Sequence, residues 1–526
     1  MAQQIDDKKR WGLTEVLSLS WPASLTMLNS TLLRFVDGLM VAFVSPAAFS
    51  AQFLGGMFAF IPESLALGTL MVVNTFVSQN YGAGRFKRTG AYVWAGLAVA
   101  MLSACMIAPL ALLAGPIFTP FGHPADVQAQ EMTYFRYMAV SALATLPARV
   151  LEQFFFGIHR PRIVLAASLI ANAFNVLANW VLIFGKLGFP AMGLEGAAIG
   201  SLASWIIQLI LLAGVFFSPA MRKRYATHLY RMVRLRHCFA LLRVGWPAGV
   251  QFCNDVACWS LFTAALVGRF GTVHLAASTA AMRYIGLSFM PAVGIGIATT
   301  ALVGKCIGEN RPDLARRRTH VAMLIATAYM GLCGLAFYLF RHPMVEFFVR
   351  IDPSTLGHGA AAAVLREQIV RIGGNIMLCA AVFQLFDAVG IVYIGALRGA
   401  GDTFWPMRMT ILLSWGLVVG GGAAAVKFAP QTTSIGPWIA ASLYVVVLGM
   451  AVAWRFESGA WQKIDLLHRK ALEPQALAGV PKLGSLRLGA LIAAKAPLLA
   501  TNQPPSIVPS PDAKADGPNN QDHVAD

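Results

Sequence analysis

The stretch AAVFQLFDAVGIVYIGAL, residues 380–397, decides the fold class of this 526-residue chain. All of its residues suit or tolerate the interior of a lipid bilayer except one aspartate, Asp387. A helix of about 20 such residues crosses a bilayer. An ionised carboxylate at that depth is unfavourable unless it faces a water-filled space or a partner. The stretch therefore predicts a membrane-spanning helix that carries a functional aspartate.

Apolar stretches of this length recur along most of the chain. The composition is 57% hydrophobic and only 12% charged, with a mean hydropathy of +0.63, which is atypical of a soluble protein. The first stretch is too long and too polar at its ends for a cleavable signal peptide. We expect an all-α, multi-pass membrane protein with twelve spans, near residues 16–43, 51–80, 91–114, 132–157, 162–185, 193–218, 241–268, 275–304, 319–341, 369–397, 407–428 and 435–455.

Lysine and arginine are distributed unevenly between the two sides of these spans. The N-terminus and the even-numbered loops hold 22 of them, and the odd-numbered loops hold six. By the positive-inside rule, both termini are cytoplasmic. The net charge of +17 then reflects topology and contact with anionic lipid headgroups, and we expect no nucleic-acid partner.

The two halves of the chain resemble each other. SWPASLTMLNS (residues 20–30) and GWPAGVQFCND (residues 245–255) share Trp-Pro-Ala at a separation of 225 residues. Gly157 and Gly395 each precede an arginine by three positions after the fourth and tenth spans. Because six spans return the chain to the same side, the halves are parallel bundles related by a pseudo-two-fold axis along the membrane normal. This architecture is typical of secondary transporters.

The repeat predicts the domain organisation. We expect a cytoplasmic N-terminus (1–14), a first lobe (15–218), a cytoplasmic linker (219–240), a second lobe (241–455) and a largely disordered cytoplasmic tail (456–526). Within the tail, residues 476–500 are mildly amphipathic and could lie on the membrane surface.

The ordered motifs resemble those of the multidrug and toxic compound extrusion (MATE) family. They are the two Trp-Pro-Ala openings, FVDGLMVAFV, VSQNYGAGR, NAFNVLANWVLIFGKLGFPAMGLEGAAIGS and FDAVGIVYIGALRGAGDT, spread over residues 15–455. The resemblance implies a MATE-like monomer in a bacterial-type inner membrane. It implies export of organic, often cationic, compounds by antiport against sodium ions or protons, without a prosthetic group.

Three aspartates within spans are the candidate coupling residues: Asp37, Asp255 and Asp387. The resemblance to the NorM-like branch implies that Asp255 and Asp387 face each other inside the second lobe. Two adjacent carboxylates repel, so a proton or a transiently bound sodium ion would relieve the repulsion. Uptake of that ion would couple to a change in the shape of the lobe.

The fifth span adds amide groups. Asn172, Asn175 and Asn179 share one helical face. Amide oxygens suit a sodium ion, so Asn175 and Asn179 are candidate coupling residues beside Asp37. The alternative is that these amides join one helix to another, as polar residues in spans commonly do.

Other charged residues within spans could modulate these sites or have only structural roles. Arg34 could pair with Asp37 on one helix, and Arg149 could pair with Glu152, for which we favour a structural pair. Glu63 suits either a cavity wall or a structural pair.

Arg283 in the eighth span departs from the family pattern. Beside Asp255 or Asp387 its charge would compete with a bound cation. We expect instead that its long side chain reaches the cytoplasmic interface or lipid headgroups.

Two other functions stay open. A flippase for a lipid-linked precursor would need a cationic cavity, for which Arg34, Arg149 and Arg283 are candidates. A membrane enzyme would need a catalytic constellation, and the sequence has neither a zinc-protease motif nor a nucleophile-elbow motif. We therefore expect a transporter and not an enzyme.

Overall fold

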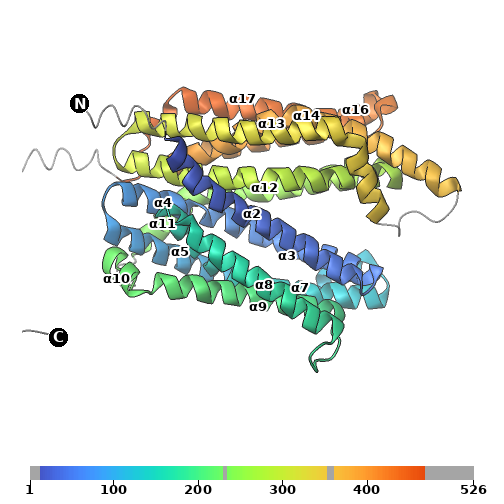
Figure 1. Cartoon of the computed structure of the whole chain (residues 1–526), viewed down its shortest axis with the longest axis horizontal. Helices are drawn as coiled ribbons and strands as arrows, with labels where there is room; N and C mark the ends of the chain where they lie inside the picture. The colour runs from blue at the N-terminus through green and yellow to red at the C-terminus, as the bar shows by residue number, and fades with distance from the viewer. Residues whose placement is uncertain (1–11, 229–233, 352–359, 468–526) are drawn as a thin grey trace, which may run out of the picture. The chain divides into compact units, whose positions relative to one another are not determined.

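The computed structural model describes residues 12–228, 234–351 and 360–467 (Figure 1). These residues form helices and turns, and no strand occurs among them. The helices of the first half are α2 (Leu13–Ala42), α3 (Pro46–Leu70), α4 (Val72–Gly82), α5 (Phe86–Ile107), α6 (Ala114–Phe118), α7 (Ala125–Gly157), α8 (Pro161–Phe184), α9 (Gly193–Phe216) and α10 (Pro219–Tyr225). Those of the second half are α11 (Leu235–Leu261), α12 (Thr272–Gly308), α13 (Pro312–Ile351), α14 (Ala360–Ala400), α15 (Phe404–Leu413), α16 (Gly422–Phe428) and α17 (Ile435–Glu457).

Eleven helical stretches of the described chain are long and apolar enough to cross a membrane. Helix α7 supplies a twelfth. It is 33 residues long but carries Glu131, Arg136, Arg149 and Glu152, which reduce its apolar character. The predicted all-α, multi-pass fold is confirmed, and the count of twelve spans agrees with the helices found.

Each half of the chain forms its own bundle with its own apolar core. In the first, α3 packs on α7, and α8 packs on α9. In the second, α14 packs on α12, α13 and α17. One large core cluster, around Phe262 and Trp438, lies within the second bundle. The other, around Phe154 and Phe216, lies mainly in the first bundle and extends to Ala248 of α11.

Two helix pairs make the most extensive contacts between the bundles. Helix α2 packs against α12, and α3 packs against α11. Figure 1 shows α2 crossing between α12 and α8, and it contacts both. Counted as spans, α2 and α12 are the first and eighth, and α3 and α11 are the second and seventh. A two-fold axis that relates the two halves of the chain would exchange these two pairs. The contact pattern is therefore the one expected of a parallel repeat.

The polar contacts between the bundles gather toward one end. The Thr75 hydroxyl donates to the Arg398 carbonyl at 2.8 Å, and the Gln79 amide donates to the Gly399 carbonyl at 2.9 Å. Glu15 forms ion pairs with Lys305 at 3.1 Å and with Arg318 at 2.9 Å.

This is the end at which the basic loops and α10 lie. Within the described chain, no hydrogen bond or ion pair joins residues 29–60 of the first bundle to the second. Polar contacts between the bundles are thus concentrated toward the basic end. Further along, the bundles are joined by the packing of α3 on α11, where the Cys253 thiol donates to the Ile61 carbonyl at 4.0 Å.

The close approach of the α2 and α12 backbones depends on a glycine of α12. The Ser24 hydroxyl of α2 donates to the Pro291 carbonyl of α12 at 2.7 Å. A Cβ atom on Gly294, one turn further along α12, would overlap the backbone of Ala23 and Ser24. Any larger residue at Gly294 must push the two helices apart.

The structure adds helical detail to two of the predicted segments. The expected linker 219–240 contains α10 and the first turns of α11, which begins at Leu235. The expected tail is ordered up to Leu467, because Trp461 is 1% exposed and stacks on Phe456 at 5.1 Å between ring centroids. The rest of the tail, including residues 476–500, lies outside the described residues.

Gly294→Val should lower the thermal stability of the purified protein. Its side chain cannot fit against α2, and overpacking of this kind costs about 1–3 kcal/mol. Gly286→Val on the same helix is the matched control, because a Cβ atom there meets nothing within 4 Å. Equal unfolding temperatures for the two variants would contradict the close α2–α12 contact.

Candidate functional site

The first bundle contains a buried polar cluster between α2 and α8. The Asn179 amide nitrogen donates to Asp37 Oδ1 at 2.8 Å and to Asn175 Oδ1 at 3.1 Å. Asn175 and Asn179 are almost fully buried, while Asp37 is half-buried. The structure brings these three predicted residues together. The suggested ion pair between Arg34 and Asp37 is not formed, since Asp37 takes its hydrogen bond from an amide.

One amide oxygen of this cluster is left unpaired. Asn179 Oδ1 is buried and has no hydrogen-bond partner in the described structure. It lies against Gly200 of α9, where a Cβ atom would overlap it. An unpaired amide oxygen beside a carboxylate offers hard oxygen ligands to a small cation or a place for a proton. Sequence reasoning missed Gly200, because its importance comes from a contact with another helix.

The second bundle contains two of the aspartates singled out in the sequence. Asp255 lies on α11 and Asp387 on α14, and the two interact electrostatically. Asp255 Oδ1 is buried without a hydrogen-bond partner among the described residues. Tyr444 of α17 interacts with both carboxylates. Two carboxylates in one site repel each other, so a cation or a proton would be stabilised there, and Asp255 Oδ1 has no hydrogen-bond partner to compete with it.

The cation associated with this pair is Arg398 and not Arg283. Arg398 follows Asp387 on α14 by 11 residues, about three turns, and interacts electrostatically with Asp255. Arg283 forms no ion pair with any residue that the structure describes. It also lies 22 residues from Lys305 on α12, so it is not at the basic end, where snorkelling to the cytoplasmic interface would place it.

A second polar network adjoins Asp255. The Asn254 amide nitrogen donates to the Ser414 hydroxyl at 3.0 Å, and the Trp415 indole nitrogen donates to the Asn254 amide oxygen at 2.8 Å. Ser414 begins a π-helical segment, Ser414–Gly421, that divides the eleventh span. Such segments occur frequently at functional sites and can change length easily. The sequence signals this segment only by its glycines.

Two further carboxylates of the first bundle are held by hydrogen bonds. Arg149 forms an ion pair with Glu152 at 2.7 Å, and the Gln208 amide donates to the other Glu152 oxygen at 2.7 Å. The geometry is that of the structural pair favoured from the sequence. Glu63 accepts a hydrogen bond from the Thr145 hydroxyl at 2.6 Å.

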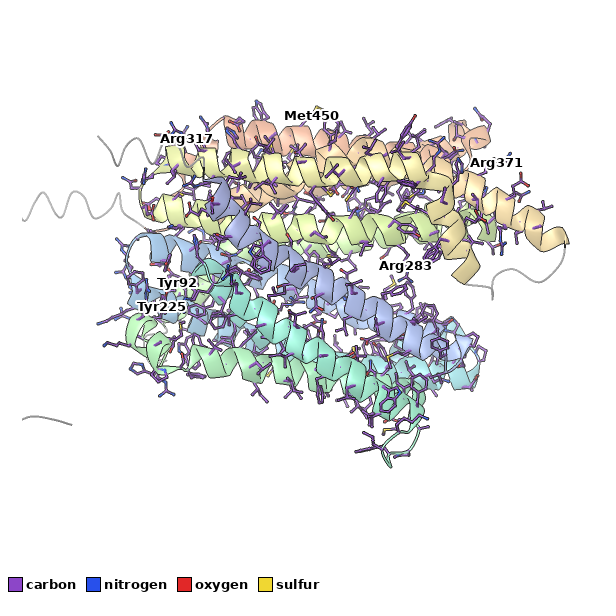
Figure 2. The ribbon with its side chains drawn as sticks, in the orientation of Figure 1. Tyr92, Tyr225, Arg283, Arg317, Arg371 and Met450 are labelled. Atoms are coloured by element: carbon purple, nitrogen blue, oxygen red, sulfur yellow. The ribbon has the colours of Figure 1, made fainter. Side chains whose placement is uncertain are left out.

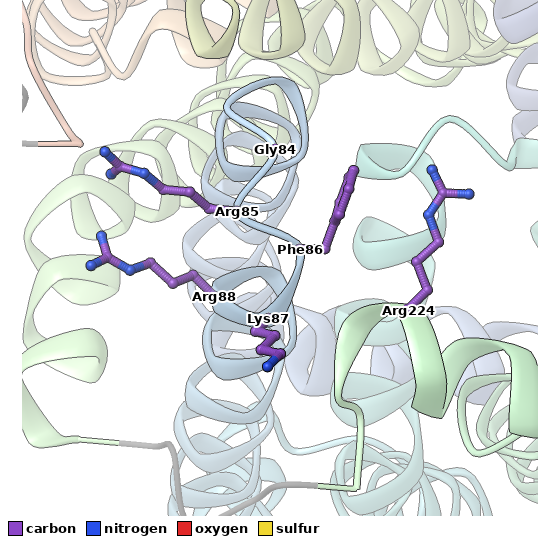
Figure 3. A pocket seen from close by; sticks show the side chains of 6 residues that line it. All are labelled: Gly84, Arg85, Phe86, Lys87, Arg88 and Arg224. Carbon is purple, nitrogen blue, oxygen red and sulfur yellow. The ribbon is translucent and has the colours of Figure 1, made fainter.

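The basic end carries a shallow pocket, lined by Gly84, Arg85, Phe86, Lys87, Arg88 and Arg224. Figure 3 shows Arg85 and Arg88 pointing to one side of the α5 N-terminus, with Phe86 and Arg224 on the other. The Arg224 guanidinium lies over the Phe86 ring at 5.0 Å. The basic side chains of this pocket suit contact with anionic lipid headgroups. That contact stays a prediction.

Twelve long helices in two bundles, eleven of them apolar enough to cross a membrane, with recessed carboxylates in each bundle, are the architecture of a membrane transporter of the secondary type. The family model MatE matches residues 22–181 and 247–420, one segment in each bundle. The chain belongs to this family.

Relatives and solved structures agree with this assignment. A protein named probable multidrug resistance protein NorM from Mesorhizobium japonicum is 27% identical over 463 residues, covering 85% of this chain and 94% of the relative. The protein of the same name from Brucella suis is 28% identical over 465 residues, covering 86% and 95%. A MOP superfamily transporter from Pyrococcus furiosus has the same fold, with a TM-score of 0.77 at 19% identity, covering 86% and 97%.

Arg149→Ala should destabilise the protein strongly, because Glu152 would keep a buried, uncompensated charge. Breaking a buried pair in this way costs about 3–5 kcal/mol. The double variant Arg149→Met/Glu152→Leu should recover much of the loss, since no charge is left buried. Thermal unfolding of the single and double variants measures this, and additive losses would refute the structural pair.

Proposed function

We propose that this chain exports small organic compounds by antiport against sodium ions or protons. The observation that carries the proposal is that each bundle holds a recessed carboxylate beside or bearing a buried oxygen without a hydrogen-bond partner, Asn179 Oδ1 next to Asp37 in the first and Asp255 Oδ1 in the second. The curated relatives are named multidrug resistance proteins, which supports a broad range of substrates. The proposal includes a bacterial-type inner membrane, a monomer with cytoplasmic termini, and the coupling ion as the only cofactor.

Coupling in the second bundle rests on Asp255 and Asp387. Without a cation their charges repel each other, and Arg398 relieves this only in part. A sodium ion or proton draws α11 and α14 together. The π-helical segment beside Asn254 and the interruption at Pro247 supply places where α11 and its neighbour can bend.

Coupling in the first bundle rests on Asp37 with Asn175 and Asn179. A proton on Asp37 would remove the charge that the Asn179 amide now stabilises. A sodium ion would instead recruit Asn179 Oδ1, whose hydrogen-bonding capacity is unused. Either event changes how α2 packs on α8. Because α2 also packs on α12, the change would reach the contact between the bundles.

A flippase for a lipid-linked precursor is the second candidate. It is favoured by the exposure of Arg34 and Arg283, which would provide positive charge for a phosphate group. Transport of a water-soluble dye, driven by an ion gradient, separates the exporter from the flippase.

Asp387→Asn should abolish gradient-driven dye efflux from inverted vesicles and leave the protein inserted and folded. The amide keeps the shape of the side chain and removes its charge. Efflux is energised in turn by a sodium gradient and by a pH gradient, which identifies the coupling ion. Glu195→Gln, an exposed carboxylate bonded to Tyr137, is the matched control and should transport normally. Normal efflux by Asp387→Asn would refute the coupling role.

A further inference from the structure

His159 follows the end of α7 in a turn whose backbone conformation favours glycine. Its φ of 61° is in the left-handed region. The His159 amide donates to the Phe156 carbonyl at 3.0 Å, and the Arg160 amide donates to the Phe155 carbonyl at 2.8 Å. These two bonds are typical of a helix end at which glycine stands in the left-handed position. A residue with a Cβ atom is less favourable there.

The second half of the chain has glycine in the equivalent turn. The tenth span, which corresponds to the fourth in the repeat, ends at Ala400, and Gly401 follows it with a φ of 89°. The Gly401 amide donates to the Arg398 carbonyl at 2.9 Å, and the Asp402 amide donates to the Leu397 carbonyl at 2.8 Å. The turn itself therefore gives no reason for a histidine after α7, so the reason must lie in its side chain.

The side chain of His159 is part of the contact between the bundles. Its ring nitrogen Nε2 lies 3.2 Å from the Ala301 carbonyl of α12 in the second bundle. A carbonyl oxygen can only accept, so Nε2 carries a proton and donates it. The ring of Tyr81 at the end of α4 lies beside the imidazole, with centroids 5.6 Å apart. Since α4 and α7 belong to the first bundle, separation of the bundles would break the bond to Ala301.

Three helices place charged groups around this contact. Lys305 of α12 and Glu15 of α2 interact electrostatically with His159. Glu15 is paired with Lys305 at 3.1 Å and with Arg318 of α13 at 2.9 Å. Glu309 lies 4.0 Å from the Lys305 ammonium. The carboxylates of this group of described residues therefore already have cations beside them, and a further positive charge on the imidazole would add to the repulsion.

The contact therefore disfavours protonation of the ring. Burial, and after it the Lys305 ammonium, lowers the pKa of His159 to about 4, although the bond to Ala301 and the charge of Glu15 act in the opposite direction. A histidine exposed to water has a pKa of about 6.5. The separated arrangement would therefore bind a proton more readily than the closed one. It follows that the contact is most stable above about pH 6.5 and weakens as the pH falls toward 4.

We propose that His159 is a pH-sensitive switch between the bundles. Its neutral ring holds the basic end closed through Ala301, and its protonation favours the arrangement in which this end is open. The proposed exporter has its basic end in the cytoplasm and must open there to load substrate, so acidification of the cytoplasm would favour loading. The inference adds regulation to the proposed exporter and in that sense rests on it.

The distance between the bundles at the basic end tests the switch without substrate or gradient. Arg222 of α10 and Arg317 of α13 are exposed, and Figure 2 shows Arg317 at the end where Tyr225 of α10 also lies. Nitroxide labels attached through p-acetylphenylalanine at these two positions avoid the seven native cysteines. Double electron–electron resonance on the full-length protein in lipid nanodiscs measures the two populations. The ratio of separated to closed molecules should rise about ten-fold from pH 7.5 to pH 5.5, as expected for one proton bound with this difference in pKa.

Three variants assign the response to His159. His159→Gln keeps a donor near the position of Nε2 but does not titrate, so its bundles should stay closed at both pH values. His159→Lys carries a permanent charge and should favour the separated arrangement already at pH 7.5. The matched control is His320→Gln, because His320 is an exposed histidine bonded at 2.7 Å to Glu457 of its own bundle. This control should keep the full response.

An equal pH response in His159→Gln and in the unmodified protein would overturn the inference, because other titrating groups would then account for it. A ratio that does not change with pH in the unmodified protein would overturn it as well. These outcomes are separate from the test of export. If the response depends on His159 while Asp387→Asn transports normally, only the coupling proposal fails. If an ion gradient drives dye export while His159→Gln responds like the unmodified protein, the exporter stands and the switch fails.

Discussion

The poor solvation of charge inside a bilayer constrains every polar feature of this protein. A carboxylate or guanidinium group at the depth of a span needs a partner or access to water. Each charged group described here meets that need in one of two ways. Glu152 is satisfied inside the protein by Arg149 and Gln208, whereas Arg283 is exposed and has no such partner.

Whether a charged group has all of its hydrogen bonds made distinguishes a structural role from a proposed functional one. A residue with all of its hydrogen bonds made has nothing left to bind, and Glu152 is of this kind. Asp255 and Asn179 each keep a buried oxygen without a partner. Burial of a polar oxygen without a partner is unfavourable, and a cation or a proton would supply that partner. The free energy of that change is what an antiporter can use to move its helices.

In the proposed mechanism, the contact between the bundles transmits such a change because it is tight and local. Gly294 allows α12 to touch the backbone of α2, and Glu15 pairs with Lys305 across the same end. Helix α2 carries Asp37 in its later turns and makes this contact with its earlier turns. Under the proposed mechanism, a shift at Asp37 would therefore move the helix that makes the contact at the basic end. Tightly packed interfaces of this kind change between discrete arrangements and do not deform gradually.

The sequence by itself indicated the multi-pass helical fold, the repeat and the family, and it singled out the aspartates that we propose as coupling residues. Apolar length and charge asymmetry are local properties, and an aspartate within an apolar run is visible without any fold. The tertiary structure decided which charges meet. Arg398, and not Arg283, lies near Asp255, and Asn179, and not Arg34, bonds to Asp37. These pairings depend on helix rotation and on neighbours distant along the chain, such as Gly200. Helical periodicity fixes the face of its own helix on which a residue lies, but only packing fixes what that face meets.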